Sequence, residues 1–458
     1  MSGSAIAGYL PEKLIIRLGT EIRIVDQNGS PVPFPTPAAF GVFMHEYMHY
    51  LHNISTVCGL SGFMNTLELW RLFRRTIDPM GFSVGSSQLD GATQDHLERL
   101  LHVLAAGRGV GQPSLCTVAT PISVKILNAT LEDKVEDHRG ALLSTFACDA
   151  EVRDDHGAAD CCRIKIGIPE IMEAAAWLLE RRLVSALTQY AAESAVPVFP
   201  YKLVSALAEH ILPGIPEETI LACILAAMQS SDPADGLQQI LRSAKKATDE
   251  GHNPLDAIRN VASEIVTTNE STLLQCLSQI EQEFAGNGIM AVAIRTILSA
   301  ARDALARRRS NPFFEIELVD DLSARRLSID QLMTQLPSCA VLQRNVGPDH
   351  EPQRDLFASF RPLNADDSDP EDGLRVIHAI FDFMGRHTRK GSLMATASLS
   401  QRQCPFYTCC NLRLRTEEQS ICLNAPWQAA DWSGWNNQGR CWYGAAVQIS
   451  RPPRGSEL

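Results

Sequence analysis

Two histidines and a glutamate near the N-terminus have the types and the spacing of a metal-assisted hydrolase. Residues 45–49 read His45-Glu46-Tyr47-Met48-His49, an H-E-x-x-H pattern inside an apolar stretch. On an α-helix the two histidines lie roughly 6 Å apart along the axis and about 40° apart around it, so both imidazoles reach one metal ion. Glu46 then lies beside that ion. Zinc lowers the pKa of a water that it binds to about 7, and the neighbouring carboxylate can carry the proton to a leaving amine.

The residues around the motif predict the helix that this chemistry needs. In TPAAFGVFMHEYMHYLHNIST, residues 36–56, Thr36 is a candidate N-cap and Pro37 suits the first turn. No glycine or proline follows Gly41 for more than a dozen residues. Chance is the competing interpretation, since this composition produces the motif in roughly two chains per hundred. The helical context favours a metal site.

A catalytic zinc usually has three protein ligands and one open position, so a third side chain is needed. His52 shares the helical face of His45 and His49 but lies about 10.5 Å along the axis from His45. Three collinear side chains cannot surround a tetrahedral ion. We therefore expect His52 to hydrogen-bond near the site or simply to pack.

Two glutamates compete for the third position. Glu68 lies in the next predicted helix, with 18 residues between it and His49. Glu173 lies in the later segment PEIMEAAAWLLE (169–180), with 123 residues between it and His49, so an insertion must return the chain to the site. The competing interpretation of Glu173 is a solvated residue of an amphipathic helix.

Both segments resemble parts of the gluzincin class of zinc metallopeptidases. The spacing to Glu68 is similar to that of aminopeptidase N-like enzymes, which place this glutamate in an Asn-Glu-Gly-type sequence, whereas this chain reads NTLELW. The segment at Glu173 resembles the E-G-x-A-x-x-x-E helix of many gluzincin-like peptidases, with Ala174 where Gly is common, the small Ala176, and Glu180 two turns on. Small residues let this helix approach the histidine helix. We prefer Glu173 and keep Glu68 as the alternative.

The resemblance covers about 40 of the 458 residues and implies roles for several of them. It implies that His45 and His49 bind Zn²⁺ and that Glu46 is the general base. It also implies that a nearby strand, either 13–18 or one within 115–127, holds an extended substrate by edge pairing. The oxyanion partner of such enzymes is often a Tyr or a His, and four candidates stay open: Tyr190, Tyr201, His138 and His156.

The composition predicts a folded protein of the cytoplasm. With 458 residues and 45% hydrophobic content, the chain can bury a large core and divide into two or three domains. A net charge of −12 argues against nucleic acid as a ligand. We expect neither secretion nor membrane association, because no signal peptide and no run of 18 uncharged apolar residues is present. Thirteen scattered cysteines suit reduced thiols rather than a disulfide framework.

The pattern of elements predicts an α+β, predominantly helical fold in three parts. The first, residues 1–200, is a zincin-like core with a small sheet. Its expected elements are strands at 13–18 and 21–26, the motif helix, a break at 58–62, helices at 63–77 and 93–106, and a β-rich insertion at 115–167. The second, residues 201–395, is a helical domain for substrate or partner binding. The helical pattern runs from 168 to 308, and a polar loop at 350–373 precedes a helix at 373–387.

The third part, residues 396–458, is a small Cys/Trp-rich module. From residue 401 onward it holds five of the thirteen cysteines and four of the six tryptophans. Four thiolates for a second, structural zinc are available from Cys404, Cys409 or Cys410, Cys422 and Cys441. Their spacing departs from the closely paired cysteines of zinc ribbons. The competing interpretation is that reduced thiols pack there as small apolar groups.

Three functions follow from these features. The first is a cytoplasmic zinc-dependent endopeptidase or aminopeptidase that acts on a protein or peptide, with helical surface available to a regulatory protein partner. The second is a catalytically inactive zincin-like protein whose helical domain binds a partner. The third is a scaffold without metal. We favour the first.

Overall fold

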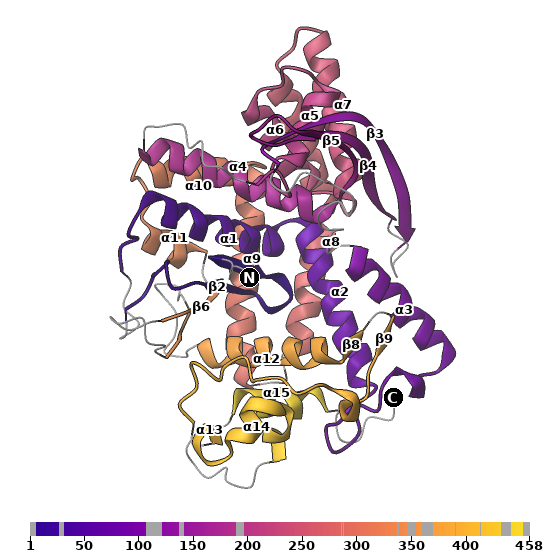
Figure 1. The fold of residues 1–458 in the computed structure, drawn as a ribbon, viewed down its shortest axis with the longest axis vertical. Coiled ribbons are helices and arrows are strands. Elements are labelled where there is room, and N and C mark those ends of the chain that lie inside the picture. Colours follow the sequence, from indigo (N-terminus) through magenta and orange to yellow (C-terminus); the bar gives the residue numbers. More distant parts are fainter. Residues whose placement is uncertain are drawn as a thin grey trace.

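The computed structural model describes most of the chain. The described residues are 6–26, 32–106, 121–136, 142–188, 197–284, 286, 288–336, 339–345, 354–359, 370–389, 391–412, 414–431 and 441–451. They form an α+β structure that is predominantly helical and carries three small sheets (Figure 1). No helix in these ranges is long and apolar enough to cross a lipid bilayer.

The histidine motif lies on α1 (Pro37–Ser55), which begins where the sequence predicts. The Thr36 hydroxyl accepts a hydrogen bond from the Ala39 N–H at 3.0 Å, and Pro37 occupies the first turn. The next helix, α2 (Val57–Arg74), follows after the single residue Thr56, whose hydroxyl accepts from the Gly59 N–H.

The expected break at 58–62 is wrong, because α2 already includes these residues. Gly59 serves close packing at the corner between the two helices instead of ending a helix. A Cβ at Gly59 would lie 2.3 Å from the His52 carbonyl oxygen and 2.5 Å from the Asn53 Cα. Only glycine lets the start of α2 approach the end of α1 this closely.

A four-stranded sheet covers part of α1. Its order is β1-β2-β6-β7, with β1 and β2 antiparallel, β2 and β6 parallel, and β6 and β7 antiparallel. The strands are β1 (Ala7–Leu10), β2 (Ile15–Leu18), β6 (Ala340–Gln343) and β7 (Leu356–Ser359). Because β2 pairs with β6, this sheet crosses the boundary expected near residue 200. The strand β7 also lies within the segment 350–373 that was expected to be a loop.

The strand expected at 21–26 is absent from the described structure. The backbone there is satisfied by a side chain: the Gln343 Oε1 accepts from the N–H groups of Ile24 (2.7 Å) and Val25 (3.2 Å). The Gln343 amide also donates to the Val25 carbonyl at 3.0 Å. A buried glutamine more than 300 residues away thus replaces a strand partner, which local sequence cannot reveal.

The β-rich insertion forms a separate antiparallel sheet in the order β3-β4-β5. Its strands follow α3 (Gly91–Ala106) and are β3 (Ser123–Glu136), β4 (Leu142–Arg153) and β5 (Ala159–Ile166). The described part of the segment 115–167 is therefore β-rich, as expected. The sheet packs against α5 and α7 at the top of the molecule in Figure 1.

The following helices build the centre of the molecule. They are α4 (Ile168–Thr188), α5 (Leu203–Ile211), α6 (Glu217–Ala227), α7 (Pro233–Asp249), α8 (Pro254–Phe284), α9 (Gly288–Ser310), α10 (Phe314–Ser323) and α11 (Ile329–Gln335). Helix α1 packs against α4 and α9, and α8 packs against α9 and α2.

A buried ion pair holds the end of α1. The guanidinium of Arg308 on α9 pairs with the Glu315 carboxylate on α10, and both side chains are fully buried. The same guanidinium donates to the carbonyl and to the hydroxyl oxygen of Ser55, each at 3.0 Å. Ser55 is the last residue of α1, so this network fixes the metal-motif helix relative to two later helices.

The last part of the chain is built around α12, and α13, α14 and α15 lie below this helix in Figure 1. Its elements are α12 (Glu371–His387), the strand pair β8 (Thr388–Arg389) and β9 (Ser392–Leu393), α13 (Leu414–Glu417), α14 (Gln419–Asn424) and α15 (Trp442–Ser450). Helix α15 lies against α12, and α12 lies against α9. The Cys/Trp-rich segment is thus in contact with the helical centre across the boundary expected near residue 395.

Candidate metal centre

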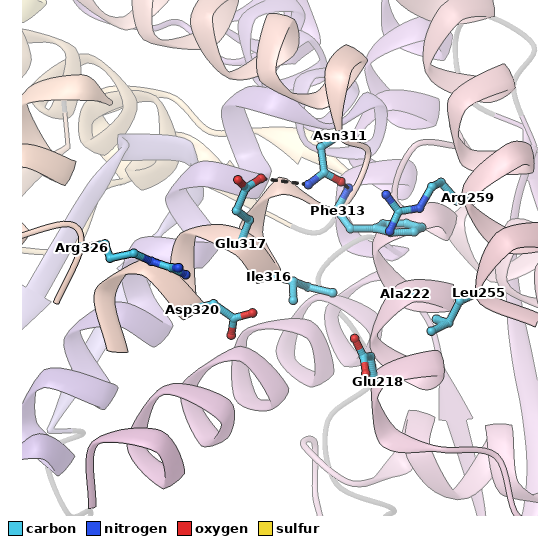
Figure 2. A pocket seen from close by; sticks show the side chains of 10 residues that line it. All are labelled: Glu218, Ala222, Leu255, Arg259, Asn311, Phe313, Ile316, Glu317, Asp320 and Arg326. Carbon is cyan, nitrogen blue, oxygen red and sulfur yellow. Dashed lines mark hydrogen bonds between the residues drawn. The ribbon is translucent and has the colours of Figure 1, made fainter. Parts of the chain in front are cut away.

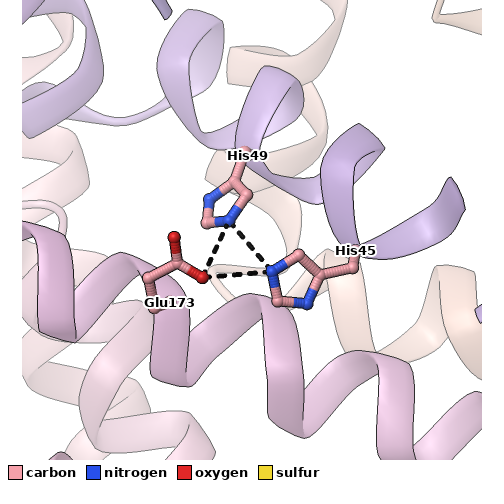
Figure 3. Close-up of side chains that lie close together, drawn as sticks. All are labelled: His45, His49 and Glu173. Atoms are coloured by element: carbon pink, nitrogen blue, oxygen red, sulfur yellow. Dashed lines mark hydrogen bonds and ion pairs between the residues drawn. The ribbon is translucent and has the colours of Figure 1, made fainter. Parts of the chain in front are cut away.

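Three side chains from two helices meet at one point (Figure 3). His45 and His49 come from α1, and Glu173 comes from α4. The Nε2 atoms of the two histidines are 3.1 Å apart, and the Glu173 Oε2 lies 3.2 Å from the His45 Nε2 and 3.4 Å from the His49 Nε2. Among the described residues, this is the set of three potential ligands whose atoms all lie within 4.8 Å of one another.

These separations suit a tetrahedral zinc ion. Zinc binds His nitrogen and carboxylate oxygen at about 2.0–2.1 Å, so two ligand atoms of a regular tetrahedron are about 3.3 Å apart. The three measured separations lie within about 0.2 Å of that value. A fourth corner remains for a non-protein ligand. The Glu173 side chain is 31% exposed, whereas the imidazoles are nearly buried, so the cluster opens toward solvent on the α4 side.

Glu180 supports the cluster from behind His45. Its Oε2 accepts from the His45 Nδ1 at 3.0 Å, which leaves the His45 Nε2 directed at Glu173. A carboxylate on the far nitrogen fixes the tautomer and orientation of a metal-binding histidine and raises its basicity. Glu180 was expected two turns after Glu173, without a role. Its place on the same helix face as Glu173 is the signal in the sequence that could have pointed to it.

Without metal, protonated His45 and the Glu173 carboxylate form an ion pair. Burial alone would lower the pKa of His45, but hydrogen bonds to Glu173 and Glu180 outweigh it and raise this pKa to about 10. Burial would likewise raise the pKa of Glu173, but hydrogen bonds from His45 and His49 hold it well below its ordinary value. A metal cation can take the place of the proton that the histidine holds.

Glu46 lies next to the cluster and is held by the backbone of β1. Its carboxylate is largely buried and accepts a hydrogen bond from the Tyr9 N–H. Burial raises the pKa of Glu46 above its usual value, while His49 and His45 oppose this shift. The Tyr9 ring stacks on the His49 ring with centroids 6.5 Å apart, and its hydroxyl accepts from the Asn53 amide at 3.0 Å.

The outer edge of β1 faces the site. The Gly19 N–H donates to the Ile6 carbonyl, so Ile6 and Gly19 are a hydrogen-bonded pair at the end of the β1–β2 ladder. Because antiparallel ladders alternate, the backbone groups of Ala7 and Tyr9 point away from β2. No other strand of the described residues pairs with that edge. The sequence carries no signal for Tyr9, since nothing near it in the chain has a metal motif.

Of the two described candidates for the oxyanion partner, Tyr201 lies at the cluster and His156 does not. The Tyr201 ring lies 5.7 Å from the His45 ring, at 80° to it. Burial raises the pKa of Tyr201 to about 12, with further contributions from Glu173, Glu46 and Glu180. His156 is on the surface, with a side chain 86% exposed. Tyr190 and His138 lie outside the described residues.

Glu68 and His52 lie outside the cluster. The Glu68 carboxylate accepts from Arg71 on α2 and from His96 on α3, each at 3.2 Å. His52 is fully buried and has no hydrogen-bond partner within the described part of the chain. Its Nε2 is 3.6 Å from the Glu315 Oε1. His52 therefore packs beneath the site and contacts the ion pair that holds α1.

Small residues bring α1 and α4 close enough for this geometry. Ala174, Ala175 and Ala176 are completely buried. On the α1 side, a Cβ added to Gly41 would lie 2.4 Å from the Val184 Cγ2 and 3.2 Å from the Glu180 Cγ. The close contact of the two helices lets a glutamate side chain reach both imidazoles.

A separate hollow lies between α6, α8 and α10 (Figure 2). Its walls carry both charges, and the side chains that line it are Glu218, Ala222, Leu255, Arg259, Asn311, Phe313, Ile316, Glu317, Asp320 and Arg326. It shares no residue with the histidine cluster, and its lining has neither a histidine nor a cysteine. The hollow therefore contributes nothing to the metal chemistry.

Comparison with known proteins adds no relative. The chain matches no protein-family model, and neither the curated proteins nor the solved structures include a significant match. The gluzincin resemblance therefore rests on the motif and on the residues quoted for it.

Proposed function

We propose that this chain is a zinc-dependent metallopeptidase that hydrolyses peptide bonds in a protein or peptide substrate. One observation carries the proposal: His45, His49 and Glu173 lie at the mutual distances of tetrahedral zinc ligands, with Glu46 beside them. Two imidazoles and one carboxylate favour zinc over calcium or magnesium, which prefer oxygen ligands. The scattered free thiols suit the cytoplasm as the place of action.

The residues around the cluster have distinct roles in this proposal. Zinc, when bound, supplies a positive charge that acidifies water and polarises a peptide carbonyl. Glu46 takes the proton from water and passes it to the nitrogen of the leaving amine.

Tyr201 is our choice for the group that stabilises the oxyanion. With a pKa of about 12, its hydroxyl keeps its proton at neutral pH and can donate a hydrogen bond. Its ring lies beside the His45 ring.

We place the substrate main chain along β1. Segment 13–18 cannot serve, because β2 has β1 on one side and β6 on the other. The Tyr9 N–H is already bonded to Glu46, so an extended peptide at this edge would pair with the remaining outward backbone groups and run past the cluster.

Metal content and peptide cleavage in matched variants test the proposal. We expect His45→Gln and Glu173→Gln each to lose one equivalent of zinc per chain. Glu46→Gln should keep that zinc and cleave unfolded casein about a hundredfold to ten-thousandfold more slowly, because only the proton carrier is lost. Mass spectrometry of the casein fragments gives the cleaved bonds.

Glu68→Gln is the matched control, because this glutamate also bonds a histidine but lies outside the cluster. It should retain zinc and activity. Unchanged zinc in His45→Gln and Glu173→Gln would refute the metal site. Wild-type activity in Glu46→Gln would refute the role of Glu46, and a zinc-loaded wild-type chain that cleaves no peptide would refute the peptidase.

A further inference from the structure

A second group of potential metal ligands lies in the C-terminal module, on the far side of α12 from α1 and α4 (Figure 1). Cys404 and Cys410 flank a turn, Cys422 lies on α14, and Cys441 caps the N-terminus of α15. We call these four residues the thiol tetrad. Each is only 8% exposed, and none forms a disulfide.

The four thiols, all among the described residues, form a loose cluster, in which no three sulfurs lie within 4.8 Å of one another. Cys404 interacts electrostatically with Cys441, Cys422 and Cys410. Cys441 interacts with Cys410 and Cys422, and Cys422 interacts with Cys410. Every pair of the tetrad therefore interacts electrostatically. A hydrogen bond from the Cys404 N–H to the Cys422 carbonyl, at 2.7 Å, also joins two of its segments.

Backbone N–H groups point at three of the four sulfurs. The Leu412 N–H donates to the Cys410 Sγ, and the Gly444 N–H donates to the Cys441 Sγ, each at 3.5 Å. The Phe406 N–H donates to Cys404 and the Tyr443 N–H donates to Cys441. For each of these three cysteines, one donor is the backbone N–H of the residue two positions later in the chain. Such bonds stabilise a thiolate more than a thiol, and they orient sulfur ligands around a metal.

Positive charge also gathers at the tetrad. The Arg415 guanidinium interacts with Cys422 and donates to the Cys410 carbonyl at 2.9 Å. Cys441 lies at the positive N-terminal end of α15, which is nine residues long. Both features favour the negative charge that four thiolates leave on a divalent ion.

Cys409 does not belong to this cluster, although it is adjacent to Cys410 and equally buried. Its sulfur donates to the Phe406 carbonyl, and its own carbonyl accepts from Arg354. Of the four tetrad thiols it interacts with Cys410 alone, and its other charged neighbours are Arg375, Asp355 and Arg354.

We propose that Cys404, Cys410, Cys422 and Cys441 bind one structural Zn²⁺ ion. Four thiolates are the ligand set of closed structural zinc sites. The module needs such a crosslink, because α13 and α14 have only four and six residues and short helices are marginal on their own. The proposal is independent of the peptidase, since it uses other residues and another part of the fold.

Zinc binding must draw the sulfurs inward. Among the described residues no three sulfurs lie within 4.8 Å of one another, whereas Zn–S bonds of about 2.3 Å place sulfurs about 3.8 Å apart. Cys404 and Cys410 flank a turn, Cys441 is the N-cap of α15 and Cys422 lies on the six-residue α14, so the adjustment involves short segments and no long helix.

The first test counts zinc in the full-length chain purified under reducing conditions. We expect Cys404→Ser/Cys441→Ser to hold one equivalent less than wild type, whereas Cys409→Ser, the matched neighbour, holds the wild-type amount. Cobalt in place of zinc should give the intense sulfur-to-metal absorption of four thiolates, and this band should disappear in the double variant but persist in His45→Gln. Unchanged zinc in the double variant would overturn the site.

The second test uses wild-type protein, so it does not depend on the folding of a variant. Titration with p-hydroxymercuribenzoate in the presence of a chromogenic zinc chelator should release one equivalent of zinc as four thiols react. Thiol modification that releases no zinc, or a disulfide between tetrad cysteines in protein purified without oxygen, would overturn the proposal.

Discussion

His45 is held between two carboxylates that do different things. Glu173 contacts its Nε2 together with His49, and Glu180 contacts its Nδ1. The hydrogen bond from Nδ1 to Glu180 fixes the orientation of the ring and leaves Nε2 free to bind an ion. At the scale of single residues, the proposed affinity for zinc therefore depends on Glu180 as well as on the three ligands.

Glu180→Gln tests this dependence. The amide can still accept a hydrogen bond but carries no charge, so we expect the Kd for zinc to rise about tenfold to a hundredfold. Glu68→Gln is a close control, because Glu68 also pairs with a histidine and both glutamate side chains are 24% exposed. Competition with a zinc chelator measures both values. Equal affinity in the two variants would remove Glu180 from the site.

The proton on His45 makes the metal-free protein sensitive to alkaline pH. Folding raises the pKa of His45 from 6.5 to about 10, because its bonds to Glu173 and Glu180 outweigh burial. Stability gained in this way is fully present below about pH 6.5 and is lost as pH rises toward 10. We expect the Tm of chelator-treated wild type to fall across this range and that of His45→Gln to change less. Parallel Tm curves would contradict the assigned pKa.

At the scale of elements, the contact between α1 and α4 decides whether ligands from both helices meet. Gly41 faces Val184 and Glu180 on α4 at less than the normal distance for a Cβ. Any side chain at this position must displace the Val184 and Glu180 side chains or move α4 away from α1. The metal geometry and the packing of these helices are therefore linked.

Gly41→Ala should lower the free energy of unfolding by about 1–3 kcal/mol, because the added methyl group overpacks the helix contact. It should also weaken zinc binding. Gly62→Ala is the matched control: Gly62 lies in α2, nothing would be within 4 Å of its Cβ, and we expect a gain of about 0.5–1 kcal/mol. Urea unfolding measures both. Two equally stabilised variants would show that α1 and α4 are not tightly packed at Gly41.

At the scale of the whole molecule, one buried carboxylate joins three distant parts of the chain. Asp382 on α12 pairs with Lys13 near the N-terminus at 3.0 Å and with Arg386 at 2.6 Å. The Tyr443 hydroxyl on α15 donates to it at 3.2 Å. Burial would raise the pKa of Asp382, but Lys13 and Arg386 hold it at about 2.

Asp382→Asn should destabilise the protein by about 3–5 kcal/mol, because two cations then stay partly buried without a counter-charge. The contribution of Asp382 is present above its unfolded pKa near 3.8 and is lost as pH falls toward 2, so the difference between variant and wild type should shrink in acid. Asp320→Asn removes a 40% exposed partner of Arg182, and we expect a change of at most about 1 kcal/mol. Equal effects at neutral pH would contradict this account.

Local patterns predicted those elements whose signals lie close together in the chain. Thr36, Pro37 and the apolar spacing indicated α1, and its cap is confirmed. The β-rich composition after residue 115 and the helical pattern from 168 also match the described structure. The expected break at 58–62 was wrong because Gly59 serves a close helix contact, which depends on the partner and not on propensity.

Elements that depend on distant partners escaped prediction. The backbone at Ile24 and Val25 is satisfied by Gln343, so no strand forms there. The strand β7 forms within an expected loop because β6 lies beside it, and β6 itself pairs with β2 across more than 300 residues. Such pairings depend on the folded arrangement of the chain.

The sequence by itself determined that two imidazoles and a glutamate lie on one helix, because a spacing of four residues and a capped helix are local properties. Only the tertiary structure decided which glutamate joins them: Glu173 meets both histidines, and Glu68 pairs with His96 instead. It also decided that Tyr9, Glu180 and Tyr201 lie next to the cluster. These contacts depend on how helices and strands far apart in the chain pack together. The spacing of residues along the sequence does not give their separation in the folded protein.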